Sequence, residues 1–194
     1  MMTEIEKRLH DYWERRGVNY YVSDVFGRRI VAAHLVKLSP QSLIEVGCGN
    51  GELFSTFKDI PRVVGVDWSQ PMLDRAAERI QRHEYKNIAL YKLDITKTED
   101  VDRFFDEMTF AYRSEKPFKL ALTRTVLMHI PEPAVLDACR NLTRLSDNLV
   151  IMEYYRPDED EKLDWHNFHH EYVTIFRDLE YEFTASYDRP DGLH

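Results

Sequence analysis

The stretch "LIEVGCGNGELF", residues 43–54, joins a short apolar run to a turn that is unusually rich in glycine. The chain has only 7 glycines in 194 residues, and three of them, Gly47, Gly49 and Gly51, lie in this turn. Glycine has no Cβ, so it adopts backbone conformations that other residues avoid and lets a ligand approach the main chain. We therefore interpret residues 43–46 as a buried strand and the turn after it as the edge of a binding site.

Strands and helices alternate along most of the chain on either side of this turn. Short apolar or β-branched runs predict strands, and apolar residues at helical spacing between them predict helices. The predicted strands are 43–46, 62–66, 88–92, 118–123, 149–153 and 181–187. The predicted helices are 5–12, 23–38, the segment from the turn to about 58, 69–82, 100–112, 132–145 and 163–179. This order indicates an α/β fold, a doubly wound and mostly parallel Rossmann-like sheet with helices on both faces.

The composition is typical of one soluble globular domain, with 43% hydrophobic and 31% charged residues. No apolar run approaches the ~20 residues that cross a bilayer, and the N-terminal segment lacks the apolar core of a secretory signal. Two cysteines, Cys48 and Cys139, are too few for a disulfide framework, so we expect a cytoplasmic protein. The 26 basic and 34 acidic residues leave a net charge of −8, which argues against a nucleic-acid partner.

Acidic and aromatic residues follow the second and third predicted strands. Ligands of doubly wound sheets bind at the carboxyl ends of the strands, where Asp67, Trp68, Asp94 and Ile95 are expected to lie. Asp67 can accept hydrogen bonds from both hydroxyls of a ribose, and Trp68 offers a flat face to a purine. Asp94 can accept from an exocyclic amine, with the Ile95 backbone close to a ring nitrogen. Together these residues predict a nucleoside site.

Two classes of nucleoside cofactor compete for this site. A dinucleotide fold requires the spacing G-x-G-x-x-G, with the pyrophosphate at the N-terminus of a helix. Here the turn reads G-C-G-N-G, so the third glycine comes one residue early, and Glu52 follows it. Because that glutamate would repel a pyrophosphate, a cationic ligand without phosphate fits better.

These stretches resemble the motifs of the class I S-adenosylmethionine-dependent methyltransferases. "LIEVGCGNGEL" is similar to the family's first motif, "VVGVDWSQPMLDRA" to its second, "YKLDIT" to its third, and "ALTRTVLMHIPEP" to the fourth-strand segment of small-molecule members. The resemblance covers residues 43–153 and implies S-adenosyl-L-methionine as the cofactor. The contacts that it implies are Glu45 with Gly47, Gly49 and Gly51 around the methionine portion, Asp67 on the ribose, Trp68 and Met72 against the adenine, Asp94 and Ile95 at the adenine edge, and Arg124 near the methionine carboxylate.

The best candidate for a catalytic base is His129, just past the fourth predicted strand. The alternative is that this histidine only packs and caps its loop, as the resemblance also implies. Methylation of exocyclic base amines uses an Asn/Asp-Pro-Pro-aromatic loop at this place, and residues 123–126 read "TRTV" instead. Methylation of cytosine C5 needs a nucleophilic cysteine beside the acceptor, and neither cysteine is well placed for that.

The acceptor side is less well defined. We expect Tyr20, Tyr154, Tyr155 and His166 to line a substrate pocket, beneath a lid formed by the two N-terminal helices. His166 and His170 are four residues apart and could bind a metal ion together with Glu153. The pattern lacks a well-placed third ligand, so we expect no metal.

The predicted organisation is a single methyltransferase domain over residues 1–194. Within it, 1–38 form the helical lid, 43–153 the cofactor-binding core, and 154–194 a loop, a helix and an edge strand on the substrate side. The family's sheet normally continues into an antiparallel strand seven, whereas here "DRPDGLH" ends the sequence, so we expect that strand to be missing or truncated.

The prediction for function is methyl transfer to an oxygen or nitrogen of a small-molecule acceptor. One alternative is an RNA or protein acceptor, which would require a basic surface beside the site. The other is a non-catalytic subunit that binds S-adenosylmethionine as the partner of another methyltransferase. The sequence does not indicate an oligomeric state.

Overall fold

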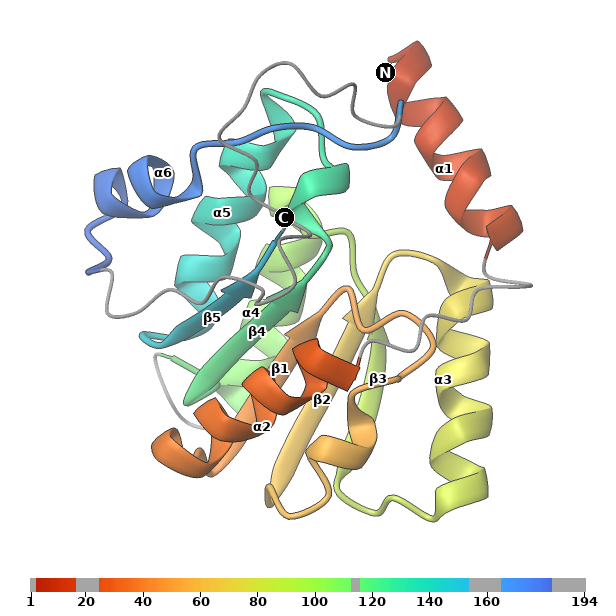
Figure 1. The fold of residues 1–194 in the computed structure, drawn as a ribbon, viewed down its shortest axis with the longest axis vertical. Helices are drawn as coiled ribbons and strands as arrows, with labels where there is room; N and C mark the ends of the chain where they lie inside the picture. The colour runs from red at the N-terminus through yellow and green to blue at the C-terminus, as the bar shows by residue number, and fades with distance from the viewer. Residues whose placement is uncertain (1–2, 17–24, 113–115, 154–164, 183–194) are drawn as a thin grey trace.

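The computed structural model describes residues 3–16, 25–112, 116–153 and 165–182, shown in colour in Figure 1. Within them, five parallel strands form one sheet in the order β3-β2-β1-β4-β5. The strands are β1 Ser42–Val46, β2 Arg62–Asp67, β3 Ile88–Lys92, β4 Leu120–Arg124 and β5 Leu149–Met152. The chain runs outward from β1 to β3 and then returns to the other side of β1, so its direction reverses between β1 and β4. This topology confirms the predicted doubly wound α/β fold.

Helices cover both faces of the sheet. They are α1 Glu4–Arg16, α2 Val25–Leu38, α3 Gln70–His83, α4 Thr98–Tyr112, α5 Ala134–Leu145 and α6 Tyr172–Asp178, with two short 3₁₀ turns, η1 Phe54–Thr56 and η2 Leu127–His129. α2 and α3 share the hydrophobic core of one face, and α4, α5 and α6 share that of the other. In Figure 1, α2 lies in front of the strands and α4 behind them. No helix in these described ranges is both long and apolar enough to cross a membrane.

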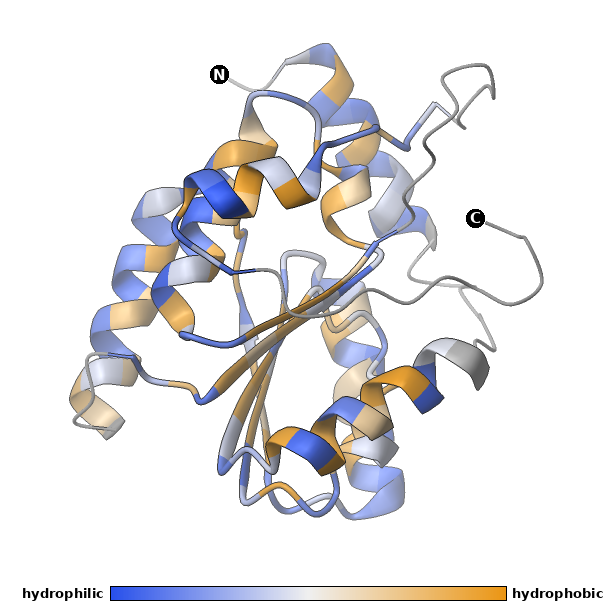
Figure 2. Ribbon diagram, turned by 60° about the vertical axis from the view of Figure 1, so that its left-hand side comes forward, coloured by the Kyte–Doolittle hydropathy of each residue, from blue (hydrophilic) through white to orange (hydrophobic). Residues whose placement is uncertain are grey.

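Two hydrophobic cores, one on each face, hold these layers together. β1 lies between them and is buried along its whole length, because alternate side chains of a strand point to opposite faces. Ile44 packs among residues of α4, α5 and α6, whereas Leu43 packs among residues of α2, η1 and α3. Figure 2 shows the strands as the most continuously hydrophobic part of the fold. A strand buried on both faces explains the unbroken apolar run in the sequence.

The predicted helix from the glycine turn to about residue 58 is wrong. The structure forms only the 3₁₀ turn η1, with bonds between residues three apart such as Phe57 N to Phe54 O at 3.0 Å. The tighter winding places the rings of Phe54 and Phe57 together in the core, where neither is exposed. Burial of two aromatic rings therefore overrides the helical propensity of this segment.

The predicted helix 163–179 is correct only in its second half. α6 begins at Tyr172, while residues 165–171 form a turn and an irregular stretch that packs against residues 128–130. The Phe168 N–H donates to the Met128 carbonyl at 2.7 Å, and the His170 Nε2–H donates to the Ile130 carbonyl at 2.8 Å. These bonds to another part of the chain replace the bonds that a helix would form within itself.

The predicted strand 181–187 begins at two residues, Tyr181 and Glu182, that are not part of any strand. The remainder of it, and the place expected for strand seven, lie outside the described residues.

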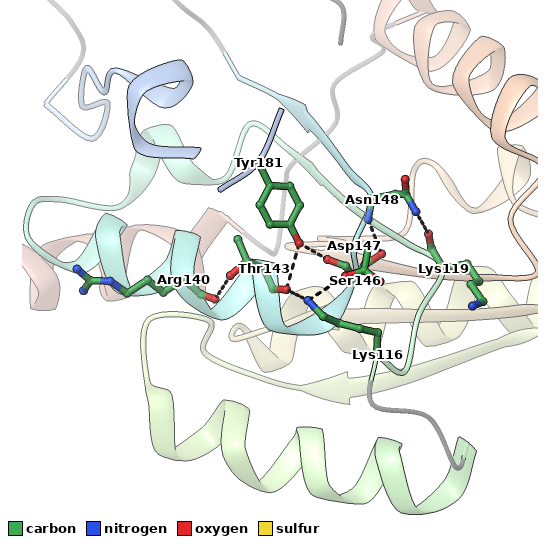
Figure 3. A network of polar contacts seen from close by, with 8 residues as sticks. All are labelled: Lys116, Lys119, Arg140, Thr143, Ser146, Asp147, Asn148 and Tyr181. Atoms are coloured by element: carbon green, nitrogen blue, oxygen red, sulfur yellow. Dashed lines mark hydrogen bonds and ion pairs between the residues drawn. The ribbon is translucent and has the colours of Figure 1, made fainter. Parts of the chain in front are cut away.

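Tyr181 instead anchors the segment after α6 to the end of α5, close to the amino ends of the strands (Figure 3). Its hydroxyl lies between the Thr143 and Ser146 carbonyls at the end of α5, at 3.2 Å and 2.5 Å. The same network includes Lys116, Lys119, Arg140, Asp147 and Asn148. Residues 165–182 thus cross the molecule from the carboxyl ends of the strands to their amino ends.

Candidate active site

A cavity of about 780 Å³ opens at the carboxyl ends of β1, β2, β3 and β4. It includes the point between β1 and β4 where the chain reverses direction, which is the usual ligand position in a doubly wound sheet. One face of α1 contributes Glu6, Leu9, His10 and Trp13 to its lining. The fold therefore brings the strand ends and the N-terminal helix to the same cavity.

The three glycines of the turn all have positive φ, but the space around them differs. A Cβ on Gly47 would lie 2.2 Å from Cγ2 of Val126, and a Cβ on Gly51 would lie 2.4 Å from Cε2 of Phe54. A Cβ on Gly49 would meet nothing within 4 Å. Gly47 and Gly49 line the cavity, whereas Gly51 lies outside its lining. Packing against neighbouring side chains explains two of the glycines, and only Gly49 faces open space.

Asp67, the last residue of β2, joins the glycine turn to the start of α3. Its two carboxylate oxygens accept the N–H groups of Gly49 and Ser69, each at 2.9 Å. Burial raises the pKa of Asp67 to about 6, and these backbone donors act in the opposite direction. An ionised carboxylate has about four lone-pair sites, so it can accept a ligand hydroxyl in addition to these donors. Ser69 occupies the N-cap position of α3 without a capping bond from its own side chain.

Glu45, in β1, is the most deeply buried acid of the cavity, with 3% of its surface exposed. Its Oε2 has no hydrogen-bond partner in the structure. Burial raises the pKa of Glu45 to about 8, and the nearby Arg124 guanidinium only partly offsets this. Arg124 also lies 3.5 Å from Oε2 of Glu52, which is buried as well. An orphaned buried oxygen of this kind fits a cationic donor from a ligand.

The end of β3 continues into a tight turn through Asp94. Its Oδ1 accepts the Thr96 N–H at 3.0 Å and the Thr96 hydroxyl at 2.6 Å. The carbonyl of the buried Ile95 accepts Nδ2 of Asn141 at 2.9 Å, which ties this turn to α5. Asp94 is therefore held by Thr96, which also lines the cavity, and Ile95 is held by Asn141, which does not.

Trp68 and Met72 supply the apolar part of the same wall. Met72 lies in the first turn of α3 and is almost completely buried, whereas Trp68 is half-buried. The Trp68 ring centroid is 4.7 Å from that of His10, so α1 contacts the wall at this point. The two side chains present a flat and a flexible apolar surface next to Asp67.

His129 ends the turn η2 after β4 and lines the cavity. Its Nδ1 lies 2.9 Å from the His166 carbonyl oxygen. A carbonyl can only accept, so Nδ1 carries the proton and the Nε2 of the neutral ring carries the lone pair. The Trp13 ring packs at 4.7 Å between centroids and covers His129 on the α1 side. The contact with residue 166 thus selects the tautomer suited to a base.

The structure brings most of the predicted site residues together. Those that line the cavity are Glu45, Gly47, Gly49, Asp67, Trp68, Met72, Asp94, Ile95, Arg124 and His129. His166 does not line it. Its ring instead packs on Tyr12 and His129, at 4.6 Å and 5.3 Å between centroids. Tyr20, Tyr154 and Tyr155 lie outside the described residues.

The sequence indicated that α1 belongs to a lid but not which of its residues line the cavity, and it did not indicate the role of Glu153. The face of α1 with Glu6, Leu9 and His10 has the spacing of one helical stripe, which could have indicated that it covers a surface. Glu153, directly after β5, occupies a strand end as Asp67 does, although its place in the sequence suggests only a metal ligand. Both of its oxygens instead accept backbone N–H groups of the turn η2. Among the described residues, no three His, Cys, Asp or Glu side chains form a group that could hold a metal ion.

A glycine turn, acids at successive strand ends and a reversal of strand order together define a nucleoside-binding Rossmann-like domain. The sequence over residues 39–173 matches the family described as "Methyltransferase domain". The match covers more than half of the chain, so the protein belongs to this family of class I S-adenosylmethionine-dependent methyltransferases. No curated protein sequence matches the chain.

Solved structures share the fold at low sequence identity. Magnesium protoporphyrin IX methyltransferase from Synechocystis PCC 6803, solved with bound SAH, has a TM-score of 0.61 and 18% identity over 87% of this chain and 82% of its own. A SAM-dependent methyltransferase from Aquifex aeolicus has a TM-score of 0.58 and 15% identity, with 91% and 88% covered. YcgJ from Bacillus subtilis has a TM-score of 0.53 and 16% identity, and 68% of this chain covers only 53% of YcgJ.

The contact between Gly47 and Val126 leads to a testable difference between two glycines. We expect Gly49→Ala to cost about 1 kcal/mol of unfolding free energy, because only the positive φ is penalised. Gly47→Ala adds a clash with Val126 and should cost about 1–3 kcal/mol more. Chemical denaturation of both variants measures the difference.

The double variant Gly47→Ala with Val126→Ala is the control. It should cost less than the sum of its single changes, because the truncated side chain removes the clash. Equal losses for the two glycine variants, or strict additivity in the double variant, would contradict the assigned contact.

Proposed function

We propose that the protein transfers the methyl group of S-adenosylmethionine to an oxygen or nitrogen of a small-molecule acceptor, with His129 as the base. The observation that carries the proposal is the placement of a histidine, in the tautomer of a proton acceptor, on the wall of the cavity that also contains Glu45 and Asp67. One cavity can then hold the methyl donor and admit an acceptor.

The residues present fit the cofactor that the family uses. The orphaned Oε2 of Glu45 is suited to the cofactor's α-ammonium group, and Arg124 to its carboxylate. Gly49, with open space on its Cβ side, lets the chain pass close to the methionine portion. These groups provide opposite charges at one end of the cavity for a zwitterionic amino-acid moiety.

The nucleoside end of the cofactor would lie along β2 and β3. The remaining lone pairs of Asp67 are available for the ribose hydroxyls. Trp68 and Met72 can pack against the adenine, and the turn with Asp94 and Ile95 can bind its edge. The residues that would hold the cofactor in this orientation line the same cavity as His129.

When bound, the cofactor supplies an electrophilic methyl group on a positively charged sulfur. His129 can take the proton of an attacking hydroxyl or amine at Nε2, while its Nδ1–H stays bonded to the His166 carbonyl. That carbonyl also stabilises the imidazolium once the proton has moved. Leu9 and Trp13 line the cavity from α1, so we assign the lid to α1. The sequence predicts the second N-terminal helix, α2, in the lid as well, but it packs on a face of the sheet through Val31 and Leu35. Excluding water and holding the reactants in line can contribute ~7–11 kcal/mol to such a displacement.

Charge supports a small acceptor over a polyanion. Seven acids line the cavity, Glu6, Glu45, Glu52, Asp67, Asp94, Asp100 and Glu107, against the four bases Lys92, Lys97, Arg103 and Arg124. An RNA acceptor would need a basic surface here to neutralise its phosphates. The structurally similar Synechocystis enzyme is named for a small-molecule substrate, magnesium protoporphyrin IX, which agrees with the proposal.

The acceptor class is tested directly by incubating the protein with methyl-labelled S-adenosylmethionine and separated pools of cellular metabolites, RNA and protein. Label is expected in the metabolite pool. Label confined to RNA or protein would replace the proposed acceptor. Tight cofactor binding without transfer to any pool would favour the non-catalytic alternative.

If the α-ammonium of the cofactor binds at Glu45, binding of the cofactor should release a proton. Burial raises the pKa of Glu45 to about 8, so the side chain is mostly protonated at pH 7. A bound cation favours its carboxylate form and lowers the pKa, so binding of S-adenosylhomocysteine should release close to one proton. Calorimetry in buffers with different ionisation enthalpies measures this number.

Two controls define the source of that proton. Methylthioadenosine lacks the amino-acid moiety, so its binding to the unchanged protein should release no proton. Glu45→Gln lacks the titrating group, so binding of S-adenosylhomocysteine to this variant should release none either. If Glu45→Gln releases as many protons as the unchanged protein, the ammonium does not bind at Glu45.

The role of His129 is tested by His129→Ala with the acceptor found above. Removing a general base should lower kcat by about 10²- to 10⁴-fold, and cofactor affinity should stay within threefold because His129 is assigned to the acceptor. His83→Ala, at the end of α3 and outside the cavity lining, is the matched control. Full activity of His129→Ala would remove it as the base and leave the structural alternative.

A further inference from the structure

Glu153 is a partly buried carboxylate that the proposed mechanism does not use. It directly follows β5 and faces the turn η2, which carries His129. Its Oε1 accepts the Val126 N–H at 3.1 Å, and its Oε2 accepts the Met128 N–H at 3.2 Å. One side chain therefore binds two backbone donors of the same short turn. Charged acceptors form the stronger class of hydrogen bond.

The turn needs such support because its backbone is strained. Thr125, a β-branched residue, has a φ of +52°, a region that residues other than glycine seldom adopt. Its N–H donates to the Met152 carbonyl at 2.8 Å. Acceptors at the end of β5 thus hold the N–H groups of Thr125, Val126 and Met128, and strained backbone of this kind persists only where its surroundings hold it.

The turn also connects the two halves of the site. At one end, the Val126 side chain fills the space that a Cβ on Gly47 would occupy, so it packs on the cofactor turn. At the other end, the His129 N–H donates to the Val126 carbonyl at 3.0 Å, and the His129 ring lines the cavity. A shift of the turn would therefore move both the histidine and the contact with the glycine turn.

We propose that Glu153 is a positioning residue that, through its bonds to the backbone of Val126 and Met128, holds His129 over the cavity in the required orientation. This inference rests on the role proposed above for His129. The carboxylate touches neither cofactor nor acceptor in this assignment. Glu153 acts on the turn η2, and the turn holds the His129 ring where its Nδ1–H can donate to the His166 carbonyl.

The surroundings of Glu153 act on its charge in two opposite directions. Burial raises its pKa to about 7, and the N–H donors of the turn lower it, so formation of the turn and ionisation of Glu153 favour each other. The titratable groups that face it are the Cys139 thiol from α5 and the Tyr172 hydroxyl from α6. Burial raises the pKa of both well above neutrality, so near pH 7 both stay uncharged beside the carboxylate.

The test is the variant Glu153→Gln, which keeps the shape of the side chain and replaces one acceptor oxygen by an N–H₂ donor. Nitrogen NMR of labelled histidine should show one tautomer for His129 in the unchanged protein, with the proton on Nδ1. In Glu153→Gln we expect both tautomers and at least tenfold faster hydrogen exchange at the amides of Val126 and Met128. An unchanged tautomer with unchanged exchange at both amides would overturn the proposal.

Turnover supplies a second readout that a general loss of stability would not reproduce. If Glu153 acts through His129, Glu153→Gln made alone should lower kcat at least tenfold. The same change made in the His129→Ala variant should lower kcat less than twofold. Equal losses in the two backgrounds would overturn the proposal. Glu78→Gln, an exposed position on α3, controls for the loss of one carboxylate.

The two proposals can fail separately. The NMR and exchange measurements need no acceptor, so they report on Glu153 even if His129→Ala proves fully active and the proposed function fails. Should Glu153→Gln not fold, Glu153→Asp keeps the charge on a shorter side chain. It should retain only one of the two bonds and show an intermediate exchange rate, whereas unchanged exchange at both amides would count against the proposal.

Discussion

Burial of carboxylates at the carboxyl ends of the parallel strands is the constraint on which the site depends. Glu45, Asp67 and Glu153 lie in or next to β1, β2 and β5, and burial raises the pKa of each. Removing a carboxylate from water is costly unless donors replace the lost hydration. The chain supplies backbone N–H donors to Asp67 and Glu153, and these same bonds shape the turns that enclose the cavity.

Glu45 differs from the other two acids because one of its oxygens has no hydrogen-bond partner among the described residues. Asp67 and Glu153 form bonds that hold turns in place, so their contribution is present without a ligand. Glu45 keeps an unsatisfied oxygen and a raised pKa, which makes its environment more favourable once a cation arrives. Structural and binding carboxylates can thus be told apart by whether the chain itself provides their donors.

Much of the fold could be predicted from local sequence because the pattern and the final environment agree. The strands β1, β2 and β3 have the expected limits within a residue, since each is an apolar or β-branched run between clear turn signals. The two helix predictions that were wrong share one cause. Residues 54–57 and 165–171 have helical spacing, but partners distant in sequence, the core around Phe54 and the backbone of residues 128–130, decide their conformation.

The sequence by itself determined the class of cofactor site, because the glycine turn and the acids at strand ends are local features whose place follows from the strand order. It also pointed to His129, though not to its tautomer. Only the tertiary structure decided why each glycine is needed. Gly47 accommodates Val126, Gly51 accommodates Phe54, and Gly49 alone faces open space. The role of Glu153 likewise came from the structure, because β4 and β5 are adjacent only in the folded sheet, where a side chain after one strand reaches the backbone after the other.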